Sequence, residues 1–463
     1  MEQLTGLDAR FLYSETPTAP MHTLKIAVMD VGSTVGGLTR EPFLSTLSER
    51  IERLPQLRER VVPIPFGLGH PVWIEDPAFV LERHVTFRRA PAPGGVRELA
   101  AIVGEVAARH LPRDRPLWDL TVVDGLDQGR VACIAKVHHA VADGLATVEM
   151  LQRALAADAP TPTPTPTRTS EPIPSRGALL RIAARGHQAT LRDLPALARR
   201  SVRGLVAAGR NRRGEVTAAK PFDAPRSPLN VSLDATRTFA MTTLPLGDLL
   251  AVRRHFGTTL NDVYLAVCGG ALRRYLAERA ELPSDPLVAA VPLATPHERS
   301  ERPGRNHVDN MFVPLGTHLA DSATRLRSIH EAVVAARHER ELLGPELFED
   351  RAALTPTHLY SLGVKVWART RFADHMRPPV NLVASNVPGP REPLQLAGVR
   401  LDAIYSVGPI LEGVGLNLTA WSYLDRLHVA ALGCRLSLPD PWLLVDQLAD
   451  SLAELVAATR VDA

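Results

Sequence analysis

The feature that most limits how this chain can fold is a proline- and threonine-rich segment before its midpoint. Residues 159–174 read APTPTPTPTRTSEPIP. Such a composition cannot build a hydrophobic core and favours an extended connection. With 463 residues, the chain is also too long for one ordinary core. We therefore expect an N-terminal lobe at residues 1–157, a connecting region at 158–220 and a C-terminal lobe at 221–463.

Both expected lobes carry alternating apolar residues, typical of strands, and apolar residues at helical spacing. In the first lobe, strands are predicted at 21–31, 120–123 and 131–137, and helices at 41–53 and 97–110. In the second, strands are predicted at 238–244, 287–293, 308–315, 380–384, 416–423 and 427–433, and helices at 246–255, 261–278, 322–342, 352–372 and 441–458. The short turns at 125–129 and 424–426 predict two β-hairpins. The sequence thus predicts a mixed α/β fold in both lobes.

The chain from Lys136 to Gly144 has the clearest chemical meaning, and it reads KVHHAVADG. It follows the strand predicted at 131–137 and precedes apolar residues at helical spacing, so it forms a strand–loop–helix turn. A neutral imidazole, from His138 or His139, is a general base poised near pH 7. A carboxylate such as Asp143 can lock the loop at the start of a helix, and Gly144 allows a tight turn. Taken alone, the pattern is equally consistent with histidines that end a strand and an ordinary helix cap.

The composition excludes several classes of protein. A net charge of only +3 gives no basis for nucleic-acid binding. Cys133, Cys268 and Cys434 lie far apart in apolar surroundings, so we expect buried thiols and neither disulfides nor a metal site. The N-terminus lacks the features of a signal peptide, and no apolar stretch approaches the length of a membrane span. We expect a cytoplasmic protein whose contact with the inner membrane or lipid bodies is peripheral.

Residues 176–213 carry ten arginines and a single acid, Asp193. Apolar residues at helical spacing give part of this segment an apolar face. One interpretation is an amphipathic segment that rests on an anionic lipid surface. The other, favoured because Pro195 and Gly204 interrupt a continuous helix, is a crossover helix packed between the lobes with its arginines solvated.

The pattern HHxxxDG resembles the signature of the acyltransferase superfamily that includes chloramphenicol acetyltransferase and peptide-synthesis condensation domains. Further segments resemble the bacterial wax ester synthase/diacylglycerol acyltransferase family, and they extend over essentially the whole chain. These segments are Phe11-Leu-Tyr with Pro20-Met-His22, Arg115-Pro-Leu-Trp118, Asn261-Asp-Val-Tyr-Leu-Ala266 and Ser385-Asn-Val-Pro-Gly-Pro390. Tyr264 departs from the smaller aliphatic residue that this family leads us to expect, which bears on local packing only.

The resemblance implies two chloramphenicol-acetyltransferase-like lobes with a tunnel between them. It also implies transfer of a long-chain acyl group from acyl-CoA, a substrate, to diacylglycerol or a fatty alcohol, with no cofactor. His139, the second histidine, is the expected base, and His138 is the less favoured alternative. Asp143 and Gly144 are expected to hold the loop, with Arg58 as the arginine partner of Asp143.

The remaining candidate residues admit two roles each. Asn261 and Asp262 sit where a helix cap and first turn belong, so they could cap the helix, contact the active site, or do both. Ser385 and Asn386 end an apolar strand, and the resemblance favours an active-site position where they could stabilise an oxyanion. Trp118 is interpreted as a core anchor in preference to a ligand contact, because tryptophan buries a large area.

Two other classes of function stay open at this point. One is a condensation-type enzyme that uses carrier-bound acyl groups, although the chain contains no carrier-like domain. The other is a non-catalytic lipid-binding protein that kept the fold. The absence of a Gly-x-Ser-x-Gly nucleophile elbow in the sequence favours direct transfer over an acyl-serine intermediate.

Overall fold

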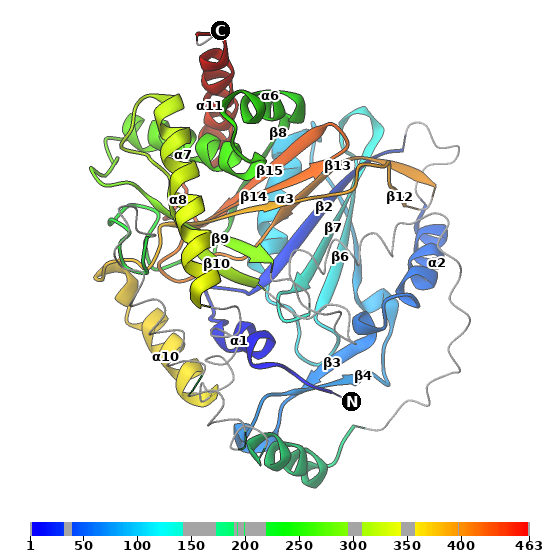
Figure 1. Ribbon diagram of the computed structural model, residues 1–463. Coiled ribbons are helices and arrows are strands. Elements are labelled where there is room, and N and C mark those ends of the chain that lie inside the picture. Colours follow the sequence, from blue (N-terminus) through cyan, green and yellow to red (C-terminus); the bar gives the residue numbers. More distant parts are fainter. Residues whose placement is uncertain are drawn as a thin grey trace.

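The computed structural model (Figure 1) describes residues 2–31, 39–141, 173–188, 192, 199, 219–294, 308–343, 357–396 and 398–461. Within these residues, two six-stranded sheets form the centre of the molecule, and a three-stranded sheet lies near the N-terminus. Helices cover the sheets. The predicted mixed α/β fold with two lobes is confirmed.

The first six-stranded sheet contains the strand that carries the histidine pair. Its order is β12–β13–β2–β7–β6–β5, and among these described strands only β5 and β6 pair in parallel. The strands are β2 (His22–Asp30), β5 (Val85–Arg89), β6 (Trp118–Asp124), β7 (Arg130–His138), β12 (Gln395–Leu396) and β13 (Val399–Val407). The predicted β6–β7 hairpin is confirmed, with Trp118 opposite Val137.

Successive side chains of a strand point to opposite faces of the sheet, and in the first sheet both faces are apolar. Helix α3 (Val96–Ala108) shares one hydrophobic cluster with Ile26 and Ile134. Helix α2 (Arg40–Ile51) contributes Phe43 to another cluster, which holds Val131 and Cys133 of β7. Strand β7 is therefore buried on both sides, and this fixes the position of its end at His138.

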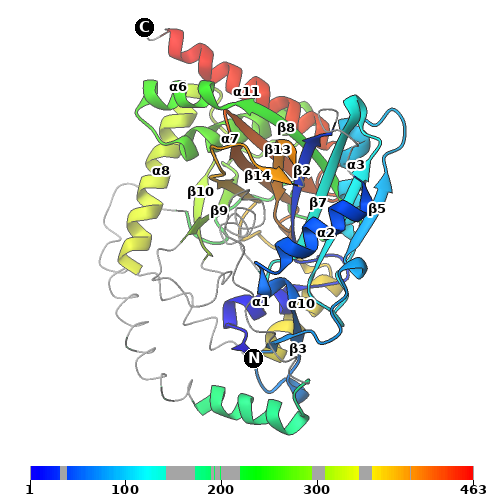
Figure 2. The same ribbon diagram turned by 90° about the vertical axis from the view of Figure 1, so that its right-hand side faces the viewer.

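The second six-stranded sheet has the order β10–β9–β11–β14–β15–β8, and its strands β9, β11 and β14 run parallel. Helix α7 packs between α8 and α11, and Figure 2 shows these helices together on one side of the sheet. The strands are β8 (Thr238–Pro245), β9 (Val288–Ala294), β10 (Val308–Pro314), β11 (Leu382–Val387), β14 (Leu416–Tyr423) and β15 (Arg426–Gly433), and the helices are α6 (Leu246–Phe256), α7 (Leu260–Glu278), α8 (Ser322–Leu343) and α11 (Pro441–Val461). The β14–β15 hairpin confirms the second predicted hairpin.

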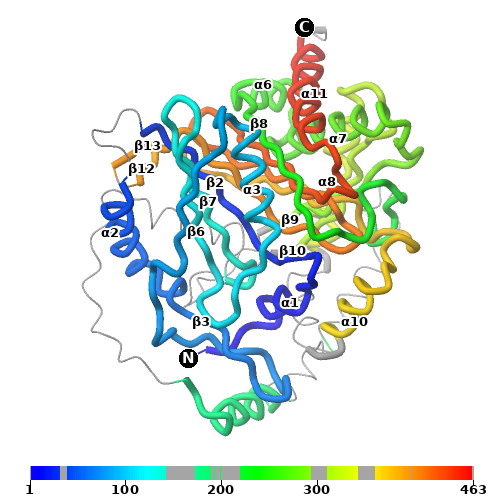
Figure 3. Tube along the Cα trace, turned by 180° about the vertical axis from the view of Figure 1, so that it is seen from behind, coloured from blue at the N-terminus to red at the C-terminus, as the bar shows by residue number. Residues whose placement is uncertain are grey.

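The two halves of the chain are joined through the sheets. Strand β13 belongs to the second half, yet it pairs antiparallel with β2 of the first half, as the view from behind in Figure 3 shows. Tyr405 of β13 also places its hydroxyl 2.9 Å from Thr243 Oγ1 of β8 in the other sheet. The sequence did not predict β13. The lobe boundaries at residues 157 and 220 stay predictions, since they adjoin residues outside the described ranges.

Helices α1 (Gly6–Ser14) and α10 (Thr357–Arg369) lie side by side below the two large sheets (Figure 1). Ser14 Oγ lies 2.9 Å from the Tyr360 hydroxyl, which connects the two helices. The predicted helix at 352–372 is confirmed where it is described, from Thr357 to Arg369. Short 3-10 helices link other described elements: η1 (Pro55–Arg58), η2 (Pro65–Gly67), η3 (Leu81–Arg83), η4 (Asp127–Gly129) and η5 (Phe372–Asp374).

The small sheet, of β1 (Glu2–Gln3), β4 (Val72–Glu75) and β3 (Glu59–Val62), supports the first part of the arginine-rich segment. Residues 176–188 are helical, and Leu179 and Ile182 pack against the sheet. Arg181 and Arg185 are exposed. Most of residues 189–213 lies outside the described ranges, so the choice between a lipid contact and a packed crossover stays a prediction. No helix in the described part of the chain is long and apolar enough to cross a membrane.

Candidate active site

The two histidines of the KVHHAVADG segment leave β7 in opposite directions, because successive side chains of a strand alternate. His138 pairs in register with His22 at the end of the β2–β7 ladder. The next residue, His139, donates its backbone N–H to Met21 O over 2.8 Å, which continues the ladder by one step. The His139 ring stacks on Phe11 of α1, with ring centroids 4.0 Å apart and an interplanar angle of 13°.

His139 lines a cavity of about 900 Å³ that both large sheets help to form. Met21, Thr23 and Lys25 come from the first half of the chain, and Val383 and Thr419 come from β11 and β14 of the second sheet. Leu7 and Phe11 of α1 and Val364 and Trp367 of α10 also line it. The cavity wall is thus partly polar and partly apolar. His139, the expected base, lies on this wall between residues of both halves of the chain, where the sequence predicted it.

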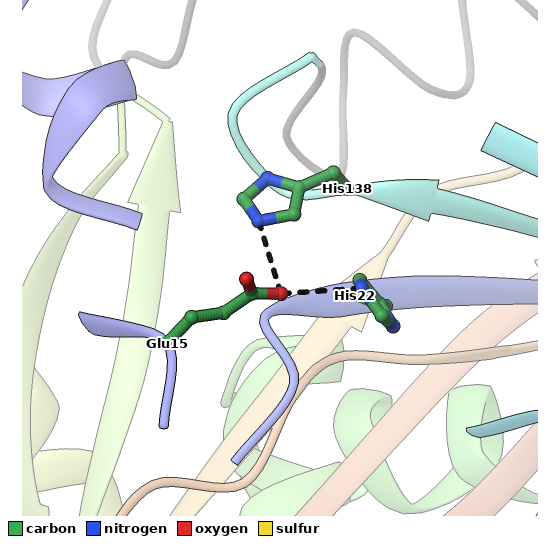
Figure 4. Close-up of side chains that lie close together, drawn as sticks. All are labelled: Glu15, His22 and His138. Atoms are coloured by element: carbon green, nitrogen blue, oxygen red, sulfur yellow. Dashed lines mark ion pairs between the residues drawn. The ribbon is translucent and has the colours of Figure 1, made fainter. Parts of the chain in front are cut away.

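His138 is fully buried and does not line this cavity. Its Nε2 lies 3.5 Å from Glu15 Oε1, and His22 Nε2 lies 3.4 Å from the same oxygen, as Figure 4 shows. Glu15 also pairs with Arg113 through Oε2, and His110 Nδ1 is 3.6 Å from Oε1. His138 therefore belongs to a polar cluster with Glu15 and His22, whereas His139 faces the cavity.

The charges in the cluster follow from burial and from the pairing. Burial lowers the pKa of His22 to about 3 and the pKa of His138 to about 4, although the Glu15 carboxylate opposes both shifts. Burial by itself would raise the pKa of Glu15. The His138 and His22 imidazoles and the Arg113 guanidinium outweigh that effect and hold this pKa well below its usual range. At neutral pH Glu15 is accordingly ionised, and the His22 and His138 imidazoles are neutral.

The cavity that His139 lines is also lined by three of the candidate residues, Asn261, Ser385 and Asn386. Ser385 pairs in register with Thr419, so both hydroxyls lie on one face of the parallel β11–β14 pair. Asn261 is the second residue of α7, where backbone N–H groups and the helix dipole favour negative charge. These are the kinds of donors that an oxyanion requires.

Asp262 has a different position from its neighbour Asn261. Its carboxylate accepts the Thr259 N–H over 2.9 Å, while Thr259 Oγ1 accepts the Asp262 N–H, which is a reciprocal capping box. The same carboxylate lies 2.8 Å from His330 Nδ1. Asp262 is completely buried and is absent from the lining of this cavity, so the structure places it in the capping box, with Thr259 as the N-cap residue.

Arg58 lies on the first lobe, where its Nη1 is 2.7 Å from Glu52 and its guanidinium stacks over Phe79. Asp143 and Gly144 lie outside the described residues. The pairing of Arg58 with Asp143 and the support of the loop by Asp143 and Gly144 consequently stay predictions.

Two aromatic residues singled out in the sequence are core residues. Trp118 is almost completely buried, donates Nε1–H to Leu57 O over 2.7 Å and stacks on His84 with centroids 4.4 Å apart. Tyr264 is also buried and donates its hydroxyl to Leu418 O over 3.1 Å. This hydrogen bond accounts for a tyrosine where a smaller aliphatic residue was expected.

Two residues beside the site, Glu15 and Lys25, were not predicted from the sequence. Lys25 is 5% exposed, lines the cavity, donates to Ser406 Oγ and lies 4.9 Å from the centroid of the Trp421 ring. A lysine within the otherwise apolar run LKIAVM was the available signal, since lysine is rarely buried without a reason. For Glu15, no local pattern pointed to the histidines that surround it.

Two lobes built on mixed sheets, with a histidine that faces a cavity between them, define a protein of the chloramphenicol-acetyltransferase-like class. Comparison with known protein families and relatives identifies the family within this class. The profile of the wax ester synthase/diacylglycerol acyltransferase catalytic domain matches residues 4–264, and the profile of the WS/DGAT C-terminal domain matches residues 305–456. A Mycobacterium tuberculosis protein that bears the name of a diacylglycerol O-acyltransferase is 37% identical over 98% of this chain and 90% of its own length.

Solved structures agree with this assignment. The wax ester synthase/diacylglycerol acyltransferase from Marinobacter aquaeolei is 26% identical, with a TM-score of 0.67 over 99% of this chain and 100% of that chain. The first condensation domain of the CDA synthetase, at 16% identity and a TM-score of 0.59 over 98% of this chain and 96% of that chain, shares the fold. The chain therefore belongs to the wax ester synthase/diacylglycerol acyltransferase family, and it is an acyltransferase.

Proposed function

We propose that this acyltransferase moves a long-chain acyl group from acyl-CoA to the hydroxyl of diacylglycerol or of a fatty alcohol, with His139 as the general base. The observation that carries this proposal is the position of His139, which faces a cavity of about 900 Å³ walled by both halves of the chain. His138, the alternative base, is enclosed in the polar cluster around Glu15 and does not line that cavity.

In the proposed reaction, His139 takes the proton of the acceptor hydroxyl while the hydroxyl oxygen attacks the thioester carbonyl. The carbonyl oxygen becomes a tetrahedral oxyanion, for which Ser385, Asn386 and Asn261 offer nearby donors. When the intermediate collapses, the carbon–sulfur bond breaks, the ester is released and the protonated imidazole returns its proton to the CoA thiolate. This route requires no cofactor and no acyl-enzyme intermediate.

The partners are thus acyl-CoA and a lipid alcohol, and we propose that the protein meets them at a membrane or lipid-body surface on the cytoplasmic side. Helix α10 supports this part of the proposal. Tyr360, Val364 and Trp367 of α10 line the cavity, while Leu362 and Val366 are 59% and 50% exposed. An apolar surface on a helix that also borders the cavity suits transfer of a lipid from an interface.

The decisive experiment is a product assay on the purified protein with long-chain acyl-CoA, offering diacylglycerol and a fatty alcohol in parallel. We expect ester formation by the wild type and a loss of about 10²- to 10⁴-fold in His139→Ala, the range for removal of a general base. His375→Ala changes an exposed histidine that does not line the cavity, and it serves as the matched control.

The other outcomes separate the rival functions. Activity that survives in a folded His139→Ala variant would contradict the assignment of the base. Transfer from a carrier-bound thioester but not from CoA would indicate a condensation-type enzyme. Tight binding of acyl-CoA or diacylglycerol without any product would indicate a lipid-binding protein.

A further inference from the structure

A mostly buried carboxylate, that of Glu15, lies directly behind the turn that contains His139. Glu15 is 13% exposed and follows α1, and its Oε1 lies 3.5 Å from His138 Nε2 and 3.4 Å from His22 Nε2 (Figure 4). Glu15 does not line the cavity. Any effect that it has on the reaction must accordingly pass through its neighbours.

The hydrogen bonds of His138 define which of its ring nitrogens carries the proton. Its Nδ1 accepts the backbone N–H of Ala140 over 3.0 Å, so this nitrogen must be unprotonated. In a neutral imidazole the proton then resides on Nε2, the atom that faces Glu15. A carboxylate that faces an N–H stabilises this tautomer, and the Ala140 hydrogen bond closes the turn that contains His139.

The same three side chains resemble a metal-binding trio, since one ligand atom of each lies within 4.8 Å of the others. The hydrogen bonds oppose that use. A metal on His138 Nε2 would displace its proton, and the neutral ring would then carry its proton on Nδ1, where it would face the Ala140 N–H. The Arg113 guanidinium, which pairs with the same carboxylate, would also repel a dication. Glu15, His22 and His138 are therefore arranged to hold an imidazole that donates its proton to a carboxylate, and not to bind a metal ion.

Glu15 also reaches the other strand beside His139. Its Oε1 is 3.5 Å from the Met21 backbone nitrogen, and the Met21 carbonyl in turn accepts the His139 N–H over 2.8 Å. The carboxylate thus supports both neighbours of the His139 backbone, His138 along the chain and Met21 across the ladder. The Phe11 ring, which also lines the cavity, stacks on the His139 imidazole.

We propose that Glu15 is a positioning residue for His139: it holds His138 as the Nε2–H tautomer, which keeps the turn at 138–140 closed and the His139 ring directed into the cavity. This inference rests on the proposed role of His139 as the base. It concerns the orientation of that base, and it leaves the binding of the substrates unaffected.

Steady-state kinetics on a double-mutant cycle test the proposal. Glu15→Gln removes the charge with little change of shape. His138→Asn keeps an acceptor where Nδ1 meets Ala140 and removes the group that faces Glu15. We expect each variant to lower kcat by about 10- to 100-fold through misplacement of the base, with KM for both substrates within about threefold of wild type. Because Glu15 acts through His138, the double variant should be no worse than the lower single variant.

Glu105→Gln is the matched control, since Glu105 pairs with Arg88 on the surface of the same lobe and should leave kcat unchanged. Multiplying effects in the double variant, or wild-type kcat in folded Glu15→Gln, would overturn the proposal. If Glu15→Gln does not fold, Glu15→Asp keeps the charge but withdraws it by one methylene, and the expected result is a reduced kcat at unchanged KM. Wild-type kcat in folded Glu15→Asp would also overturn it.

A second readout does not depend on activity. Nitrogen-15 NMR of histidine-labelled protein, with the His138 signals identified by their loss in His138→Asn, should show an unprotonated Nδ1 in the wild type and loss of this fixed tautomer in Glu15→Gln. A protonated Nδ1 in the wild type, or stoichiometric zinc binding that Glu15→Gln abolishes, would overturn the proposal. If the wild type makes no ester, the proposed function fails, whereas the NMR result still decides the role of Glu15.

Discussion

At the scale of single residues, neighbouring side chains in this chain lie in different surroundings, because the backbone directs them to opposite sides. His138 enters a polar cluster and His139 enters the cavity, as alternation along a strand requires. Asn261 borders the cavity, while Asp262 completes the capping box of α7 with Thr259. In both pairs the sequence indicated a candidate stretch, and the structure showed which of the two residues lines the cavity.

Trp118 and Trp367 allow the two interpretations of a tryptophan to be tested. Trp118→Phe keeps the stack on His84 but removes the Nε1–H that serves Leu57 O. We expect a loss of about 1–3 kcal/mol in the free energy of unfolding, because a buried carbonyl loses its donor, with kcat/KM close to wild type. Denaturant unfolding and steady-state kinetics measure the two quantities.

Trp367→Phe is the matched comparison, because Trp367 is a half-buried residue of the cavity lining. We expect it to change KM for a lipid substrate more than it changes stability. A large fall in kcat/KM for a fully folded Trp118→Phe variant would contradict its role as a core anchor.

At the scale of the secondary-structure elements, locally paired strands were predictable and distant pairings were not. The β6–β7 and β14–β15 hairpins follow from two apolar runs and a short turn. Strand β13 was not predicted, since Arg400 and Asp402 make its sequence resemble a loop and its partner, β2, lies in the other half of the chain. The pairing is decided by burial in the assembled core.

Helix α10 carries a prediction of its own. Leu362 and Val366, spaced by one helical turn, are exposed, as are Lys365 and Arg369 nearby. We expect the double substitution Leu362→Glu with Val366→Glu to weaken binding to anionic lipid vesicles by at least about tenfold, since it replaces apolar contacts by repelled charges. Co-sedimentation with vesicles measures the binding.

Leu436→Glu is the control for that substitution, because Leu436 is a similarly exposed leucine, at 49%, in the turn after β15. Activity toward an acceptor dissolved in detergent should persist in the α10 variant, while activity toward an acceptor embedded in vesicles should fall. Unchanged vesicle binding would exclude α10 as the lipid-facing surface.

At the scale of the whole molecule, buried histidines make stability depend on pH. Burial lowers the pKa of His428 to about 4, and the pKa values of His138 and His22 to about 4 and 3, whereas an unfolded histidine titrates near its ordinary 6.5. Between these values the unfolded chain binds more protons than the folded chain. The free energy of unfolding should therefore decrease as pH falls below about 6.5, by about 1.4 kcal/mol per pH unit for each such histidine.

His428 isolates one contribution to this slope. It lies at the junction of the two large sheets, with Nδ1 3.0 Å from Thr243 Oγ1 and its ring against Tyr405. Denaturant unfolding between pH 7.5 and 5 should show a slope in His428→Phe that is shallower by about one proton than in the wild type. An identical slope would show that His428 takes up its proton in the folded state as readily as in the unfolded state. Glu15 contributes little in this window, because its carboxylate is ionised in the folded state and mostly ionised in the unfolded state above its ordinary pKa of 4.5.

The sequence by itself determined the mixed α/β character, most helices and strands, both hairpins and the stretch that contains the proposed base. It also identified the family, through residues that lie close together within each motif. The helices, strands and hairpins depend on local periodicity and turn chemistry, which a chain expresses over a few residues, whereas the family rests on the resemblance of those motifs.

Only the tertiary structure decided which distant residues meet. It joined β13 to β2, gathered His139, Asn261, Ser385 and Asn386 around one cavity, and placed Glu15 beside His138. Periodicity shows that a side chain faces a core, but it carries no information about which other segment supplies the opposite wall. That choice is made by the packing of the whole chain, where burial of apolar surface and pairing of buried polar groups must be satisfied together.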